Sequence, residues 1–163
     1  MSIKFQEVSH FYEKAKKNEF LPAAINKINL EIEEQGEFVM IMGHTGSGKS
    51  TSMQHINGLL LPTSGEVLIG DLKITNKKRK NPKLAPIRKK IGFVFQFPEY
   101  QLFEETVLKD IIYGPKNFGF SDEEAKKAAI DIAKRLNITS ILDSSPFNLS
   151  GGQMRKVAIA GIL

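Results

Sequence analysis

The segment GHTGSGKS, residues 43–50, has the residue types and the spacing of a loop that binds phosphate groups. Its glycines let the backbone adopt dihedral angles that other residues resist, so successive N–H groups can face one bound anion. Lys49 adds a cation for the β- and γ-phosphates of a nucleotide, and the Ser50 hydroxyl is a suitable ligand for Mg²⁺. The segment therefore predicts a nucleotide site.

The sequence on both sides of this loop predicts the strand and the helix that such a loop requires. Phe38–Met42 is a short, continuous apolar run, which is typical of a strand buried on both faces of a parallel sheet. A helix should begin at Lys49 and end near Gly58, because glycine readily terminates helices. The strand–loop–helix order distinguishes the motif from a chance glycine loop.

Further short strands are predicted in the first hundred residues. Ile28, Leu30 and Ile32 alternate with polar residues in the period of a half-buried strand. Other strand candidates cover residues 3–8, 65–71 and 91–95.

After residue 98 the apolar pattern becomes helical. Val107, Leu108, Ile111 and Ile112 share one face of a helix, and Ser121 with Glu124 forms a capping box that starts another. Behind that box an apolar stripe is predicted to contain Ala125, Ala128, Ala129, Ile132, Ala133 and Leu136.

The net charge of +5 comes from a single segment. Residues 77–90 hold eight basic and no acidic side chains, so the remainder carries 15 basic against 18 acidic residues. Asparagine and proline interrupt the segment, which favours a solvated connector. An anionic membrane surface and nucleic acid are the alternatives, and the lack of aromatic residues for base stacking disfavours the second.

Composition excludes several other classes. The chain of 163 residues is 41% hydrophobic, enough for one domain with a core, and it contains no cysteine for disulfides or thiolate zinc sites. The N-terminus is too polar for a signal peptide, and no apolar run approaches the ~20 residues of a membrane span. His10, His44 and His55 show no metal-site spacing. We expect a soluble chain that attaches to a membrane at most through a partner.

Two further motifs carry a family resemblance. Leu149-Ser150-Gly151-Gly152-Gln153 matches the signature of ATP-binding cassette (ABC) ATPases, and Gln96 stands where that family has its Q-loop glutamine. The resemblance runs through all 163 residues. The segment FQFPEYQLFEETV, residues 95–107, resembles ATPase subunits of energy-coupling factor (ECF) transporters, and the second A-type subunit more than the first.

The resemblance implies an α/β P-loop NTPase fold with an N-terminal antiparallel β subdomain and a helical insertion. The implied divisions are a nucleotide-binding core over about 1–97, a helical subdomain over 98–148 and the signature segment over 149–163. The family's Walker B strand, D-loop and switch histidine would follow this last segment. His44 is therefore interpreted as a variable loop residue and not as the catalytic switch.

The resemblance also implies which residues bind ATP and Mg²⁺. Ser50 and Gln96 would complete the Mg²⁺ and water environment, with Lys49 and Gln96 supporting catalysis. Tyr12 would stack on adenine; Phe11 is the competing choice, and a core position is the alternative for either ring. The phosphates would lie against Gly43, His44, Thr45, Gly46, Ser47, Gly48, Lys49, Ser50 and Thr51.

Partners follow from the same resemblance. Ser150, Gly151, Gly152 and Gln153 would face the nucleotide of a second ATPase subunit in a head-to-tail homo- or heterodimer. A transmembrane T component and a substrate-binding S component, which selects the vitamin or transition-metal ion, would complete an importer at the cytoplasmic face of a prokaryotic membrane. Candidates for contact with the transmembrane partner, or for plain packing, are Phe97, Tyr100 and Phe103.

Two expectations concern the chain by itself. Its only Asp-Glu pair, Asp122-Glu123, follows the predicted helix cap and no hydrophobic strand, so we expect ATP hydrolysis near background. Without a neighbouring Walker B strand, Phe38–Met42 would be an unpaired apolar edge, so we expect marginal stability and aggregation.

Three other functions fit the motifs less well. A chromosome-structuring or repair ATPase would separate the two motifs by coiled coils, but no heptads are present here. A ribosome-associated factor would carry two cassettes in one chain. A nucleotide-binding fragment without catalysis is the third alternative.

Overall fold

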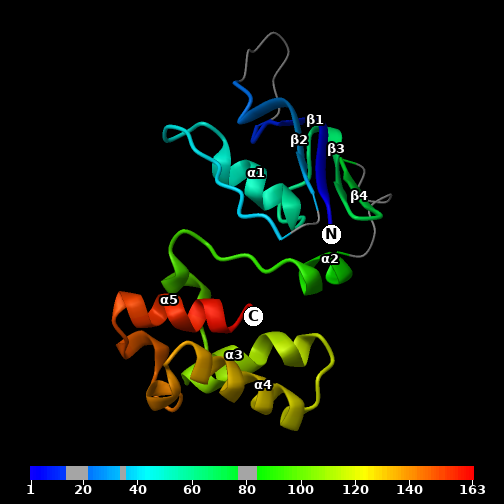
Figure 1. The fold of residues 1–163 in the computed structure, drawn as a ribbon. Coiled ribbons are helices and arrows are strands. Elements are labelled where there is room, and N and C mark those ends of the chain that lie inside the picture. Colours follow the sequence, from blue (N-terminus) through cyan, green and yellow to red (C-terminus); the bar gives the residue numbers. More distant parts are fainter. Residues whose placement is uncertain (14–21, 34–35, 77–83) are drawn as a thin grey trace. The chain divides into compact units, whose positions relative to one another are not determined.

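The structure, a computed structural model, describes residues 1–13, 22–33, 36–76 and 84–163 (Figure 1). It divides into two compact units, Met1–Ile91 and Gly92–Leu163. The sequence-based domain boundaries near residues 97 and 148 stay a prediction.

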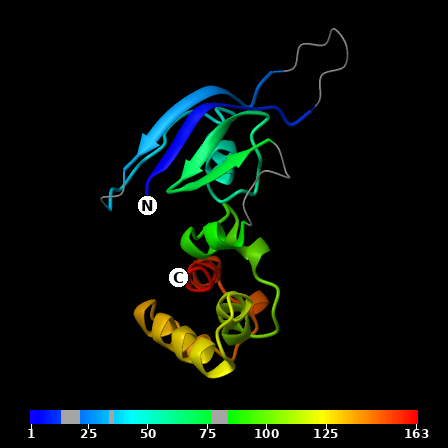
Figure 2. The ribbon, with the colours of Figure 1, turned by 90° about the vertical axis from the view of Figure 1, so that its right-hand side faces the viewer.

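The first unit contains a four-stranded antiparallel sheet, which Figures 1 and 2 show with helix α1 beside it. Its strands are β1 (Ile3–His10), β2 (Ile25–Ile32), β3 (Ser64–Ile69) and β4 (Leu72–Thr75), in the order β2-β1-β3-β4. A turn at Gly70-Asp71 joins β3 to β4. The predicted strands at residues 3–8, 28–32 and 65–71 are therefore confirmed.

The core of the first unit lies between this sheet and two helices. Helix α1 (Lys49–Ile56) ends beside Gly58 as predicted, and α2 (Ala85–Lys90) follows the sheet. The buried core residues come from all of these elements: Phe5, Val8, Ile25, Ile56, Val67, Ile69, Ile74 and Ile87.

Helix α2 corrects the prediction that residues 77–90 form a connector throughout. Residues 85–90 are helical, Pro86 lies in the first turn where proline is tolerated, and Ile87 is fully buried. Burial of this single apolar side chain holds the basic helix to the core. Residues 77–83 lie outside the described residues.

Two other strand predictions are wrong in this structure. Phe38–Met42 forms no strand, and its side chains are exposed, from 38% for Ile41 to 89% for Phe38. Residues 91–95 also form no strand, and Val94 and Phe95 are exposed. A strand needs a hydrogen-bonded neighbour, and no described segment pairs with either stretch. Apolar character alone therefore did not determine their structure.

The second unit consists of helices and short 3₁₀ turns. The α-helices are α3 (Val107–Asn117), α4 (Asp122–Arg135) and α5 (Gly151–Ala160). The 3₁₀ turns are η2 (Pro98–Gln101), η3 (Thr139–Ile141) and η4 (Pro146–Asn148). None of the helices in the described part of the chain is long and apolar enough to cross a membrane.

Helix caps and small apolar residues explain the packing of the second unit. The predicted capping box of Ser121 and Glu124 is present, and α4 packs through Ala125, Ala129 and Ala133. Ala128 is exposed, contrary to the predicted stripe, because it lies about 100° around the helix from Ala129. Other buried residues of this core are Leu102, Val107, Ile111, Ile138, Val157, Ala158 and Ala160.

Truncation of Ile111 tests this core. Ile111 is 2% exposed in the α3 face that packs on the other helices. Ile111→Ala should lower the free energy of unfolding by about 2–4 kcal/mol, because it removes buried methyl groups and leaves a cavity. Urea denaturation followed by far-UV circular dichroism measures the change. The half-buried neighbour Ile112 provides the matched control Ile112→Ala, and equal losses in both variants would contradict the assignment.

Candidate functional site

The loop of residues 43–48 enters helix α1 through a constrained backbone at Gly48. Gly48 is the N-cap of α1 with φ of 84°, in the left-handed region. A Cβ atom there would lie 2.4 Å from the carbonyl oxygen of Ala24 and 2.6 Å from Cγ2 of Ile25. Only glycine satisfies both the dihedral angle and the close approach to β2.

The N-terminus of α1 is suited to an anion. Gly48 provides no side-chain cap, and the first turn contains no acidic residue. The first N–H groups of the helix have no intrahelical acceptor, and the helix dipole places positive potential at this end. A phosphate group is the ligand that such a terminus accepts readily.

Lys49 folds back over the loop that precedes it. Its Nζ donates to the carbonyl oxygens of Gly43 and His44, both at 2.8 Å, and lies 3.4 Å from Oγ of Ser47. The ammonium group is thus held inside the curve of the loop by exchangeable contacts. Phosphate oxygens are stronger acceptors than these carbonyls, so the same position fits a cation that binds phosphate.

The remaining predicted loop residues differ in accessibility. Thr51 is buried. The exposed residues are His44, Thr45, Gly46, Ser47 and Ser50. The exposed Ser50 hydroxyl suits the oxygen chemistry of Mg²⁺, which retains several waters and uses few protein ligands. Gln96 is exposed in the second unit, and its pairing with Ser50 at one Mg²⁺ ion stays a prediction.

Tyr12 lies beside α1. Its ring is 65% exposed, and its hydroxyl is 2.9 Å from Oγ1 of the buried Thr51. Phe11 is half-buried, and its backbone N–H donates to Oγ1 of Thr63. Tyr12 is therefore the more accessible ring for a base, while its contact with adenine stays a prediction.

The sequence did not predict that His10 and His55 are buried next to Tyr12. The His10 ring packs edge-to-face against both Tyr12, at 4.9 Å between centroids, and His55, at 4.8 Å. The signal was partly available, because His10 is two residues before Tyr12 and His55 is four residues after Thr51 on one helix face. No group of three metal-ligating side chains occurs among the residues that the structure describes.

The signature residues start helix α5. Ser150 is the N-cap, and its Oγ accepts from the backbone N–H of Gln153, whose side chain in turn accepts from the N–H of Ser150 at 3.0 Å. This reciprocal capping box was readable in the sequence as Ser-x-x-Gln but was not predicted. It satisfies the donor of Gln153, while the exposed N–H groups of Gly151 and Gly152 have no intrahelical acceptor.

No contact with the described residues explains why the signature has glycine at positions 151 and 152. A Cβ atom at Gly151 or Gly152 would meet no atom within 4 Å. Glycine in a helix costs up to ~1 kcal/mol relative to alanine. The glycines therefore leave open space in front of two backbone donors.

Exposed aromatic rings gather in the segment that contains Gln96. Phe97 is 53%, Tyr100 85% and Phe103 56% exposed, so none of these rings is simply a core residue. An open, largely apolar pocket of about 490 Å³ is lined by Phe95, Gln96, Phe97, Tyr100 and Gln101.

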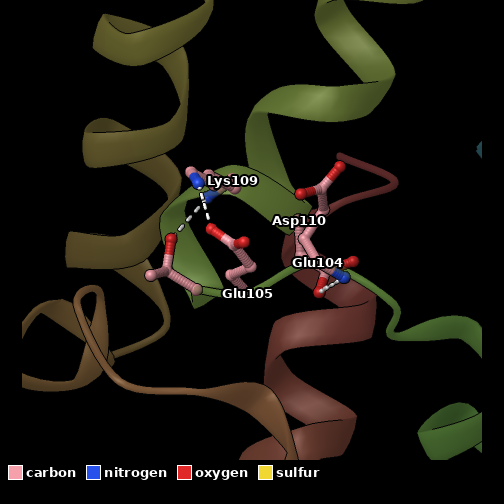
Figure 3. A network of polar contacts seen from close by, with 5 residues as sticks. Glu104, Glu105, Lys109 and Asp110 are labelled. Carbon is pink, nitrogen blue, oxygen red and sulfur yellow. Dashed lines mark hydrogen bonds and ion pairs between the residues drawn. The ribbon is translucent and has the colours of Figure 1, made fainter.

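A carboxylate from α3 holds the end of this segment, as Figure 3 shows. Asp110 is 9% exposed and accepts from the backbone N–H groups of Phe103 at 3.4 Å and Glu104 at 3.1 Å. Burial raises the pKa of the Asp110 carboxyl, and these two hydrogen bonds oppose that rise. On the exposed side, the hydrogen bond and charge of Lys109 lower the pKa of Glu105.

Several curated proteins are similar in sequence to this chain. Energy-coupling factor transporter ATP-binding protein EcfA2 of Clostridium perfringens is 53% identical over all of this chain, and that of Geobacillus kaustophilus is 52% identical. The chain spans 56% and 55% of the length of these two relatives.

Solved structures of ABC cassettes have the same fold. The structure of cbiO1 from Clostridium perfringens, described as part of the ABC transporter complex cbiONQ, has a TM-score of 0.78 at 34% identity over 99% of this chain and 60% of that one. The dimeric structure of MJ0796, described as a bacterial ABC transporter cassette, has a TM-score of 0.81 at 38% identity over 99% of this chain and 68% of that one.

The match to a protein family agrees with the similar sequences and the similar structures. The ABC transporter family matches residues 25–163, a span that contains the phosphate-binding loop, Gln96 and the signature. The structural neighbours are ABC ATPase cassettes, so the expected α/β P-loop fold with an antiparallel sheet and a helical part is confirmed. The chain belongs to the ABC transporter family.

Proposed function

We propose that this chain binds ATP with Mg²⁺ as the nucleotide-binding part of an ATPase subunit in an ECF-type importer. The observation that carries the proposal is the loop of residues 43–48, with Lys49 held inside its curve and Gly48 opening into α1. The similarity to EcfA2 proteins supports the ECF assignment.

Each part of MgATP has candidate groups in the chain. The phosphates would take the N–H groups at the start of α1 and the Lys49 ammonium, which would exchange its carbonyl acceptors for phosphate oxygens. Mg²⁺ would be held by Ser50 and Gln96, and it would supply positive charge that stabilises the negative charge on the phosphate groups. Tyr12, exposed beside Thr51, would stack on the adenine.

The signature would serve the nucleotide of a second ATPase subunit. The N–H groups of Gly151 and Gly152 and the dipole of α5 form an anion-binding terminus, and the absent Cβ atoms leave room for close approach of a ligand. These glycines lower helix stability, and no packing against the described residues compensates for that loss, which supports a role for them toward another molecule. We propose a head-to-tail homo- or heterodimer, in keeping with the dimeric MJ0796 structure.

The aromatic segment would receive a transmembrane partner. Phe97, Tyr100 and Phe103 are exposed, and the pocket beside Gln96 is mainly apolar, which suits an apolar helix face of a T component. Asp110 would keep the end of this segment in place through Phe103 and Glu104. The complete importer, with an S component that selects a vitamin or a transition-metal ion, would place this chain peripherally at the cytoplasmic face of the membrane.

We propose that this chain by itself binds ATP without appreciable hydrolysis. Its only Asp-Glu pair, Asp122-Glu123, lies in the exposed first turn of α4, directly after the N-cap Ser121 and not after an apolar strand. An in-line attack on the γ-phosphate needs a carboxylate or an equivalent group to orient the water.

Lys49 provides the first test of the nucleotide site. Lys49→Ala should weaken ATP binding about tenfold or more, because it removes a charged donor to the phosphates. Equilibrium titration with a fluorescent ATP analogue measures the loss. Lys73→Ala is the matched control, since Lys73 lies in β4 and pairs with Glu66. Equal affinities of wild type and Lys49→Ala would refute the phosphate-loop assignment.

Substitution of Ser150 tests whether the signature binds the nucleotide of a second subunit or the nucleotide bound by its own chain. Ser150→Ala should leave the ATP affinity of the dilute, monomeric chain within about twofold of wild type, because the proposed ligand of the signature is bound by another subunit. The same titration measures it, with Lys49→Ala as the positive control for loss. An affinity loss for Ser150→Ala as large as that for Lys49→Ala would contradict the proposed dimer geometry.

Hydrolysis is tested by phosphate release under saturating MgATP. The rate for this chain alone should be indistinguishable from that of Lys49→Ala, because its Asp-Glu pair lies in the first turn of α4 and does not follow an apolar strand. A rate that is clearly higher for wild type and lost in Lys49→Ala would show that the chain supplies its own catalytic group.

A further inference from the structure

Four residues at the end of β1 and on α1 form a closed ring of contacts. His10 ends β1 and Tyr12 follows it, while Thr51 and His55 lie one turn apart on α1. The Tyr12 hydroxyl meets Oγ1 of Thr51, Nδ1 of His55 meets the backbone carbonyl of Thr51 at 2.7 Å, and His10 packs between His55 and Tyr12. The ring therefore connects Tyr12 to the helix that follows the loop.

The two histidines are oriented by backbone carbonyls. Nδ1 of His10 is 3.1 Å from the carbonyl oxygen of Leu61, as Nδ1 of His55 is close to that of Thr51. A carbonyl oxygen only accepts, so both rings must carry a proton on Nδ1 and donate it. These bonds hold the planes of the rings at 78° to one another.

The two histidines are buried. His55 is 0% and His10 8% exposed. Burial lowers the pKa of His55, against the opposing effect of the Thr51 carbonyl, so its ring is neutral near pH 7. Nε2 of His55 has no hydrogen-bond partner among the described residues. The pair contacts Tyr12 through the His10 ring, which packs edge-to-face against it.

Tyr12 needs such support because most of its surface is exposed. Its hydroxyl contact with Thr51 restrains one end of the side chain, and the edge-to-face contact with His10 sets the direction of the ring. An exposed aromatic side chain without a packed neighbour would populate several rotamers, and stacking on a base would then cost the entropy of ordering it. His10 packs against both Tyr12 and His55 and orders the Tyr12 ring before a ligand binds, so the entropy cost of ordering it on binding is smaller.

We propose that His10 and His55 are positioning residues that hold Tyr12 in the orientation for stacking on the purine base, so that they determine affinity for the nucleoside part of ATP and not for its phosphates. This inference rests on the proposed function, in which Tyr12 contacts the base. His10 contacts no loop residue among its described hydrogen bonds and ring contacts, which makes it the better residue for the test.

The first experiment compares ATP with inorganic tripolyphosphate, each titrated in competition with a fluorescent ATP analogue. Loss of base stacking weakens binding by roughly five- to 150-fold. Tyr12→Ala should therefore lower the affinity for ATP by about fivefold or more. His10→Ala, which keeps the Tyr12 ring but removes its support, should lower it by about three- to tenfold, and neither variant should change the affinity for tripolyphosphate. Lys49→Ala should weaken both ligands, and Glu31→Ala, at the other end of the sheet, neither.

A conservative variant separates positioning from folding. His10→Phe keeps an aromatic ring between Tyr12 and His55 and loses only the bond to Leu61, so it should restore most of the ATP affinity that His10→Ala loses. A merely structural role would make the losses follow unfolding free energy and affect both ligands equally. His55→Phe repeats the comparison from the second ring.

Fluorine NMR of protein labelled with 3-fluorotyrosine reports the orientation of Tyr12 directly. The chain contains three tyrosines, and Tyr100 and Tyr113 belong to the second unit. His10→Ala should shift and broaden the resonance that Tyr12→Phe removes and leave the other two in place.

The outcomes distinguish this inference from the proposed function. A normal ATP-to-tripolyphosphate affinity ratio in His10→Ala, together with a lowered ratio in Tyr12→Ala, would overturn the inference and leave the nucleotide site intact. An unchanged ratio in Tyr12→Ala would remove the base contact and the inference with it. ATP binding that is unaffected by Lys49→Ala would refute the nucleotide site itself.

Discussion

The close approach of Gly48 to Ala24 is the constraint on which the first unit, Met1–Ile91, depends. It joins the start of β2 to the start of α1 at a point where no Cβ atom fits and where the backbone is left-handed. The sheet thereby determines where α1 begins, and with it the direction in which its first N–H groups and Lys49 face. The same helix then carries Thr51 and His55 to the residues at the end of β1.

The two candidate anion sites use helix N-termini in different ways. At α1 the cap is a glycine with no side-chain hydrogen bond, and a lysine side chain accompanies the free N–H groups. At α5 the cap is a serine in a reciprocal box with Gln153, which satisfies one donor and leaves the two glycine N–H groups exposed. The N-terminus of α1 suits an anion that the loop of residues 43–48 also surrounds. The N-terminus of α5 suits an anion that is bound to another molecule.

Local features of the fold were predictable because each depends on residues close in the chain. The capping box at Ser121, the end of α1 near Gly58 and the alternation of β2 involve neighbours within about a turn or a strand. Phe38–Met42 failed as a strand for the opposite reason: a strand requires a partner elsewhere in the chain, and apolar sequence does not supply one. Helix α2 was missed because the burial of Ile87 outweighs the effect of its charged neighbours.

The candidate site shows the same distinction between local features, which the sequence predicts, and long-range contacts, which it does not. The sequence by itself determined the family and located the candidate phosphate-binding loop and the signature motif, because their residue types and spacing are contiguous and chemically specific. Only the tertiary structure brought His10 and Tyr12 to Thr51 and His55, since Tyr12 and Thr51 are 39 positions apart and meet through the pairing of the sheet and the packing of α1. Long-range contacts of this kind depend on the register of strands and the direction of a helix, which no short stretch of sequence encodes.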